Sequence, residues 1–183
     1  MTPRAFQVDA VPFEPHRAEL HAVRERVFVI EQGVPADLER DALDPLSHHV
    51  LARDARGQPI GTGRLTPDRR IGRMAVLPDW RGQGVGEALL AALLAQAHAL
   101  GWAEVSLHAQ VSALRFYARH GFLPQGHRFM EAGIEHQSMH RALDAVNPVT
   151  SREAGLAAVL GVVAGARRQL LVYSRRQDPG LLP

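Results

Sequence analysis

The sequence predicts an α/β fold of the α+β kind: a mixed, mostly antiparallel sheet flanked by helices, with a C-terminal helix-strand extension. Short apolar segments bounded by proline and glycine alternate with segments of helical periodicity, in the order β-α-βββ-α-β-α-ββ. One strand is followed by a glycine-rich loop, a helix and another strand, which is typical of a right-handed crossover inside a mixed sheet. The chain has 183 residues, enough for one well-buried domain, which we place at residues 1–146.

The first half of the chain predicts four strands and one helix. Residues 6–11 are apolar and strand-like, and residues 15–30 carry apolar side chains at helical spacing. An acidic, turn-rich segment follows at residues 36–47. Three further strand-like segments end at turn residues and predict an antiparallel meander; they lie at residues 49–53, 60–66 and 70–77.

The second half begins with the clearest helix, at residues 84–100. Gly101 can end this helix in the left-handed conformation. Its apolar face comprises Val85, Leu89, Ala92, Leu93 and Leu100. The remaining elements are a strand at 104–109, a helix at 112–120 and two strands at 123–129 and 137–143.

Composition excludes several classes of chemistry. The chain has no cysteine, and all 21 basic residues are arginine, so disulfides, thiolate nucleophiles, Schiff bases and a P-loop lysine are ruled out. Residues 1–150 hold 16 arginines against 17 acidic residues, which indicates no nucleic-acid partner for the main body. The first ten residues contain no apolar stretch of signal-peptide length, and we therefore expect a cytoplasmic protein.

The glycine-rich stretch W-R-G-Q-G-V-G-E-A, at residues 80–88, predicts an anion site. Its glycines let backbone N–H groups at a helix start approach a phosphate, and Arg81 can add a charge-assisted contact. The spacing fails the dinucleotide fingerprint in both registers, because the third position is Glu87 or Leu89.

With its neighbours, the stretch R-M-A-V-L-P-D-W-R-G-Q-G-V-G-E-A-L-L resembles the acyl-CoA-binding signature of the GNAT superfamily of N-acetyltransferases. The core pattern of that signature is [Q/R]-x-x-G-x-[G/A]. The resemblance implies acetyl-CoA as cosubstrate, with no metal, and a tetrahedral oxyanion held by a backbone N–H around Ala75–Val76. The residues that it implies for binding are Met74, Ala75, Val76, Arg81, Gly82, Gln83, Gly84, Val85, Gly86 and Gln110.

A second match, A-L-R-F-Y-A-R-H-G-F-L-P, resembles a helix signature of the same family. It implies that Tyr117 protonates the departing CoA thiolate; the alternative is that Tyr117 is a core aromatic like Phe116 and Phe122. Many relatives carry asparagine near the start of this helix, so Gln110 or Ser112 would have to substitute here.

A third match, V-R-E-R-V-F-V-I-E-Q-G-V-P, resembles the ElaA-like branch of the family, and together the matches cover residues 6–143. For the group that takes the ammonium proton we rank Glu31 first, His108 second and His49 third. Glu31 could instead pair with an arginine one turn away, Arg26 or Arg24. His49 could instead fill an edge position of the sheet.

We therefore expect an N-acetyltransferase that moves an acetyl group from acetyl-CoA to a primary amine of a small molecule, by direct attack in a ternary complex. The alternative is a non-catalytic CoA-binding module that acts through its extension. The acidic residues 37–44 could attract a cationic amine, although an exposed loop is usually acidic for solubility alone, and we favour that explanation. No metal site is expected, because His48 and His49 are adjacent and point to opposite faces of a strand.

The extension at residues 147–183 is basic and apolar. Its 13-residue apolar segment, at residues 154–166, falls short of the roughly 20 residues that span a bilayer. The following A-R-R-Q-L-L-V-Y-S-R-R-Q-D-P-G-L-L vaguely resembles the opening strand of a phospholipase-D-like module. No H-x-K motif follows, so the resemblance implies at most a remnant of such a second domain. We expect it to dock or to support a homodimer, not to catalyse.

Overall fold

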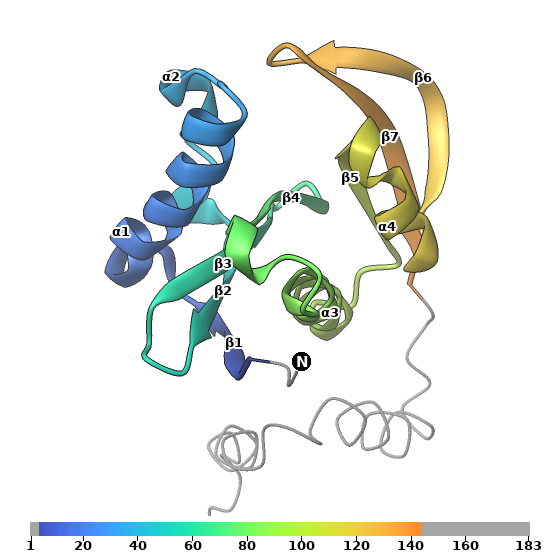
Figure 1. Ribbon diagram of the computed structural model, residues 1–183. Helices are drawn as coiled ribbons and strands as arrows, with labels where there is room; N and C mark the ends of the chain where they lie inside the picture. Colours follow the sequence, from blue (N-terminus) through green and yellow to red (C-terminus); the bar gives the residue numbers. More distant parts are fainter. Residues whose placement is uncertain (1–3, 144–183) are drawn as a thin grey trace, which may run out of the picture. The chain divides into compact units, whose positions relative to one another are not determined.

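The structure, a computed structural model, describes residues 4–143 and contains one seven-stranded sheet (Figure 1). The strand order is β1-β2-β3-β4-β5-β7-β6, and only the β4–β5 pair is parallel, which confirms the predicted fold class. The division at residues 146 and 147, the extension and its proposed homodimer contact lie outside the described residues. The strands are β1 Phe6–Val11, β2 His48–Asp54, β3 Pro59–Leu65, β4 Arg70–Val76, β5 Glu104–Gln110, β6 Leu123–Glu131 and β7 Ile134–Ala142.

The first helical segment is longer than predicted and changes its geometry along its length. Helix α1 continues directly into a π-helix, η1, so residues 13–31 are helical throughout. Such π-helical turns are rare and are frequently found at functional sites. The helices are α1 Phe13–Arg24, η1 Glu25–Glu31, α2 Ala36–Glu39, η2 Asp44–Leu46, η3 Pro78–Trp80, α3 Val85–Ala99, η4 Val111–Ala113 and α4 Leu114–Arg119.

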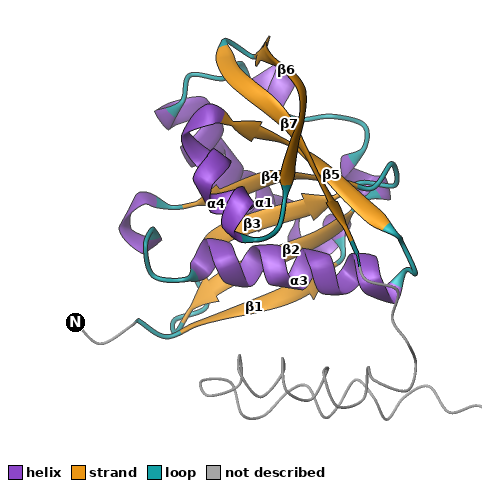
Figure 2. Cartoon of the chain, turned by 90° about the vertical axis from the view of Figure 1, so that its right-hand side faces the viewer, coloured by secondary structure: helices purple, strands orange, loops and turns teal. Residues whose placement is uncertain are grey.

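Helices cover both faces of the β1–β4 half of the sheet. In β2, Val50 and Ala52 belong to the core cluster around α3, whereas Leu51 packs with Phe13 and Leu20 of α1. Successive side chains of a strand point to opposite faces, so α3 and α1 must lie on opposite sides. Figure 2 shows α3 lying across these strands.

Helix α3 is flanked by two glycines in the left-handed conformation: Gly84, its N-cap, has a φ of 85°, and Gly101, which follows the C-cap, has a φ of 70°. Its buried side chains are Val85, Leu89, Leu90, Leu93, Leu94 and Ala97. The predicted face was therefore partly wrong: Leu100 is 40% exposed, because the helix ends at Ala99 and Leu100 follows it as the C-cap.

The sheet opens between β4 and β5. The two strands pair only through Arg70 with Ser106 and Ile71 with Leu107. Strand β4 then has a β-bulge, because its pairing with β3 shifts register between Gly72 and Ala75. Bulged strands bend, and bulges are over-represented next to active sites. The bulge and the separation of the strands leave the end of β4 unpaired on its β5 side.

Candidate active site

The glycine-rich loop presents a row of backbone donors. Gly82 and Gly84 have φ of 69° and 85°, a conformation that glycine adopts at no steric cost. Residues 81–84 form a loosely bonded turn, and in this described part of the chain no N–H group of residues 82–87 makes a close, well-aligned hydrogen bond to a backbone carbonyl; the first helical bond of α3 runs from the Ala88 N–H to the Gly84 carbonyl oxygen. These donors lie at the positive end of a 15-residue helix, an arrangement that favours negative charge.

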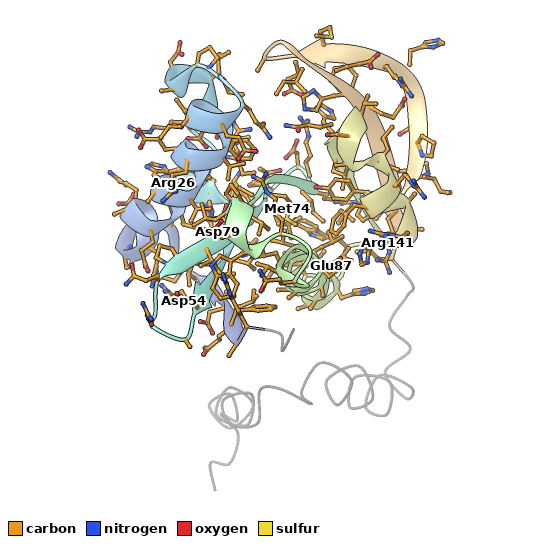
Figure 3. All side chains as sticks on the ribbon, viewed as in Figure 1. Arg26, Asp54, Met74, Asp79, Glu87 and Arg141 are labelled. Atoms are coloured by element: carbon orange, nitrogen blue, oxygen red, sulfur yellow. The ribbon has the colours of Figure 1, made fainter. Side chains whose placement is uncertain are left out.

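The end of β4 lies beside this loop. The Leu77 N–H donates to Ile60 of β3 at 2.9 Å. Peptide groups alternate in direction along a strand, so the Val76 N–H and C=O face the β5 side, where β5 no longer pairs. The Val76 carbonyl accepts a hydrogen bond from Arg81 Nε at 3.0 Å. Met74, one strand repeat earlier, lies near the middle of the molecule in Figure 3.

Glu31, the last residue of η1, pairs with Arg81. Both terminal nitrogens of Arg81 donate to the Glu31 carboxylate, Nη1 to Oε1 at 2.8 Å and Nη2 to Oε2 at 2.6 Å. The hydrogen bonds from Arg81 lower the pKa of Glu31 below its usual value. The predicted alternative, a pair with Arg24 or Arg26, is wrong: Arg24 binds other carboxylates, and Arg26 points outward in Figure 3. Two residues 50 positions apart, each predicted for a different task, are therefore in direct contact.

A pair of amides connects the same helix end to β5. Gln110 Nε2 donates to Gln32 Oε1 at 2.8 Å, and Gln32 Nε2 donates back at 3.4 Å. The pair links the segment after η1 to the end of β5, the strand that separates from β4. Gln32 was missed as a site residue; its place directly after Glu31 was the signal that could have found it.

Tyr117 in α4 has a buried ring and a hydroxyl without a described partner. Its ring makes edge contacts with Phe116 and Phe122, at centroid distances of 5.0 and 5.8 Å. Burial raises the pKa of Tyr117 to about 12, so the hydroxyl stays protonated at neutral pH. Phe116 in turn lies close to the start of α3, because a Cβ placed on Gly86 would be 3.7 Å from its ring. Tyr117 therefore directly follows Phe116, whose ring lies against the first turn of α3, the helix that begins after the glycine-rich loop.

The two histidine candidates have different surroundings. His108 lies on β5 two residues before Gln110, hence on the same face, and its Nδ1 is 3.0 Å from Glu131 Oε2. His49 is buried in β2, with Nε2 2.8 Å from the Asp44 carbonyl oxygen, and burial lowers its pKa. The edge position suggested for His49 is wrong, because β2 lies between β1 and β3.

Two acidic residues of the segment after η1 are buried, although most of the segment is exposed. Glu39 and Asp44 are buried and bind Arg24 of α1, whose Nη1 donates to Asp44 Oδ1 at 2.9 Å and whose Nε donates to Glu39. Neither attraction of an amine nor solubility explains these two residues. They are neutralised inside the protein.

Two more arginines extend this network toward partly exposed side chains, since Arg73 is 26% and Asp41 31% exposed. Arg64 of β3 donates to Asp41 at 2.8 Å and to Asp44 at 2.6 Å. Arg73 donates to the Glu39 carbonyl oxygen at 3.0 Å and to Asp41 at 3.0 Å. Arg73 occupies the β4 bulge with a φ of 51°, which is strained for a residue with a side chain. Three arginines and three carboxylates thus hold the acidic segment against the bulge.

The described residues, 4–143, include neither a metal-binding cluster nor a membrane-spanning helix. Within that range no three histidine, aspartate or glutamate side chains are grouped so that they could hold a metal ion. None of the helices described there is long and apolar enough to cross a membrane.

Comparison with known proteins agrees with this geometry. A family model described as an acetyltransferase (GNAT) domain matches residues 14–143. The chain is 39% identical over 121 residues to YjcF of Bacillus subtilis strain 168, named as an uncharacterized N-acetyltransferase; the match covers 64% of this chain and 86% of YjcF.

Solved structures share the fold. An acyl-CoA N-acyltransferase from Pseudomonas aeruginosa superposes with a TM-score of 0.68 at 31% identity, covering 75% of this chain and 100% of that one. ElaA of Escherichia coli gives a TM-score of 0.67 at 26% identity, covering 75% and 99%.

Proposed function

The chain belongs to the GNAT family of N-acetyltransferases, and on that premise we propose that it transfers an acetyl group from acetyl-CoA to a primary amine by direct attack in a ternary complex. The observation that carries the proposal is the row of N–H groups at residues 82–87 that make no close backbone hydrogen bond, beside the opening between β4 and β5. A diphosphate fits such a row, and a thioester arm fits a strand end with unpaired peptide groups.

In this proposal the donor is held by two elements. The N–H groups of Gly82 to Gly86, with Gln83 and Val85 between the glycines, bind the diphosphate of acetyl-CoA. The thioester arm of acetyl-CoA lies along Met74, Ala75 and Val76. The Val76 N–H stabilises the oxyanion that forms at the thioester carbonyl oxygen. Gln110 closes the β5 side through its bond to Gln32. Preorganised donors of this kind supply much of the rate enhancement in acyl transfer.

The proton balance assigns the remaining roles. The acceptor ammonium loses one proton to Glu31, or to His108 in second place, and the neutral amine then attacks the thioester carbon. The C–N bond forms, the C–S bond breaks and the thiolate leaves. Tyr117, protonated because burial raises its pKa to about 12, donates its proton to the departing thiolate, and the proton that the attacking nitrogen loses as the amide forms reprotonates Tyr117. The products are the amide, CoA as its thiol and one released proton.

Two measurements test this function. Isothermal titration should show acetyl-CoA binding at micromolar to millimolar affinity, and thiol release with a panel of primary amines should show turnover. The protein contains no cysteine, so a thiol reagent has no background from the chain. Binding without thiol release across the panel would favour the non-catalytic CoA-binding module; no binding at millimolar ligand would reject both functions.

Tyr117→Phe tests the role of the hydroxyl. Removal of a general acid typically lowers kcat by about 10²- to 10⁴-fold, and we expect a fall of that order with KM for acetyl-CoA little changed. The thermal midpoint should stay close to that of the wild type, since the hydroxyl bonds to no described residue. The chain's other tyrosine gives the matched control, Tyr173→Phe, outside the family match. Equal kcat in both variants would remove Tyr117 from the mechanism.

A further inference from the structure

Arg81 and Glu31 are assigned to different substrates, and yet each is the other's partner. Arg81 directly precedes the glycines that would bind the diphosphate, whereas Glu31 is the leading candidate for the acceptor's proton. Their two hydrogen bonds, at 2.8 and 2.6 Å, occupy both oxygens of the carboxylate. In this arrangement the guanidinium already compensates the charge of Glu31, so the carboxylate attracts an ammonium group fully only after the pair opens.

The pair can open at little cost. The side chains of Arg81 and Glu31 are 45% and 38% exposed. Exposed ion pairs contribute only about 0–1 kcal/mol, because water solvates both partners when they separate. Arg81 keeps a second hydrogen bond, from Nε to the Val76 carbonyl oxygen, which holds it at the end of β4 beside the glycine loop.

The position of Glu31 favours a cation. Glu31 ends a helical segment that runs from Phe13, and the carbonyl groups at a helix C-terminus give it partial negative charge. A carboxylate at that end is unfavourable without a positive partner. Within residues 4–143 Arg81 is the cation paired with Glu31. If Arg81 leaves, the same position will attract another cation.

We propose that Arg81 holds the place of the acceptor ammonium in the free protein, and that the diphosphate of acetyl-CoA draws Arg81 away and releases Glu31 for the acceptor. This inference rests on the proposed function. It makes the acceptor an amine that arrives as a cation, and it makes binding ordered, with acetyl-CoA first. It also couples the two sites: Glu31 competes with the diphosphate for one guanidinium, and by linkage each substrate raises the affinity of the other.

The coupling is measurable with acetyl-CoA alone, before the acceptor is identified. By isothermal titration, Glu31→Gln should bind acetyl-CoA about threefold to fivefold more tightly than wild type, because Arg81 no longer has a competing carboxylate. Arg81→Gln should bind it more weakly. In the Arg81→Gln background, Glu31→Gln should have no further effect.

Glu25→Gln is the matched control. Glu25 lies on the same π-helix, is exposed and pairs only loosely with Arg40 at 3.9 Å, so its substitution removes the same charge without touching Arg81. An equal gain in affinity for Glu25→Gln would show a general charge effect and overturn the inference. Unchanged affinity in Glu31→Gln, or a gain that persists without Arg81, would overturn it as well.

The failure of the proposed function gives a different result. In that case neither the wild type nor Glu31→Gln binds acetyl-CoA at millimolar concentration. Measurable wild-type binding with no response to Glu31→Gln leaves the proposed function intact and rejects only the coupling.

Discussion

Two clusters of arginine and carboxylate beside the candidate site differ in their access to water. In the network around Arg24, the side chains of Arg24, Glu39 and Asp44 are 1–3% exposed. In the Glu31–Arg81 pair, both side chains are more than one-third exposed. Both clusters are built from guanidinium and carboxylate groups. Burial holds the first in place, whereas contact with water lets the second exchange partners.

A buried charge cannot change partners, because separation would leave it without water. The network therefore fixes the acidic segment and, through Arg73, the bulge that opens the sheet at β4. An exposed pair can exchange partners freely. The difference separates charges that shape the site from charges that are available to substrates, and it can be tested by breaking each cluster in turn.

The largest effect is expected for Arg24→Met. Removal of Arg24 leaves Glu39 and Asp44 buried with fewer positive partners, since Asp44 keeps Arg64 at 2.6 Å and Glu39 keeps Arg73 at 3.7 Å. Removal of one partner from a buried ion pair costs about 3–5 kcal/mol in free energy of unfolding. Urea denaturation measures this cost. The control is Arg17→Met on the same helix, where the exposed pair with Glu14 predicts a loss below about 1 kcal/mol. Similar losses in both variants would contradict the distinction between the clusters.

A smaller effect is expected from acid. Burial opposes ionisation of Asp44, but hydrogen bonds from Arg24 and Arg64 lower its pKa to about 2. The folded state therefore releases this proton more readily than the unfolded chain, and the carboxylate contributes stability above about pH 4. That contribution, about 2 kcal/mol, is lost as the pH falls from about 4 through 2.

Asp44→Asn checks the assignment. The variant should be less stable at neutral pH, and its unfolding free energy should fall less steeply than that of wild type between pH 4 and pH 2. Urea midpoints across this range measure the slope. Parallel curves for the two proteins would show that Asp44 does not carry the acid sensitivity.

The smallest effect on stability is expected for Glu31→Gln. The exposed pair with Arg81 predicts a change below about 1 kcal/mol in free energy of unfolding, even though the same substitution should change acetyl-CoA affinity. Thermal and urea unfolding of the variant measure it. A loss comparable to that of Arg24→Met would show that Glu31 is structural, and that the two clusters do not differ.

The sequence predicted the parts of the site that depend on local chain geometry. The glycines at 82 and 84, the helix after them and the parallel crossover all follow from short stretches of sequence, and all are present. The resemblance to a known family then assigned the loop a ligand that spacing alone could not name.

Pairings between distant residues were not predictable in the same way. Arg24 meets residues 15 and 20 positions away, and Glu31 meets Arg81 at 50 positions, so helical spacing suggested the wrong partners. The left-handed backbone conformation of Arg73 was also not predictable, because no local sequence feature requires it. Its guanidinium donates to three acceptors on the acidic segment, and these long-range bonds stabilise the conformation. Burial of Glu39 and Asp44 depends on those same long-range contacts.

The arginine network has a chemical consequence for an enzyme that modifies amines. A lysine in any of its positions would present an ε-amine, which is itself an acceptor for acetyl groups and would lose its charge on acetylation. Guanidinium groups stay protonated and are poor nucleophiles. The charges that hold the β4 bulge therefore survive exposure to a reactive thioester, and a chain with no lysine leaves the protein no side-chain amine to acetylate on itself.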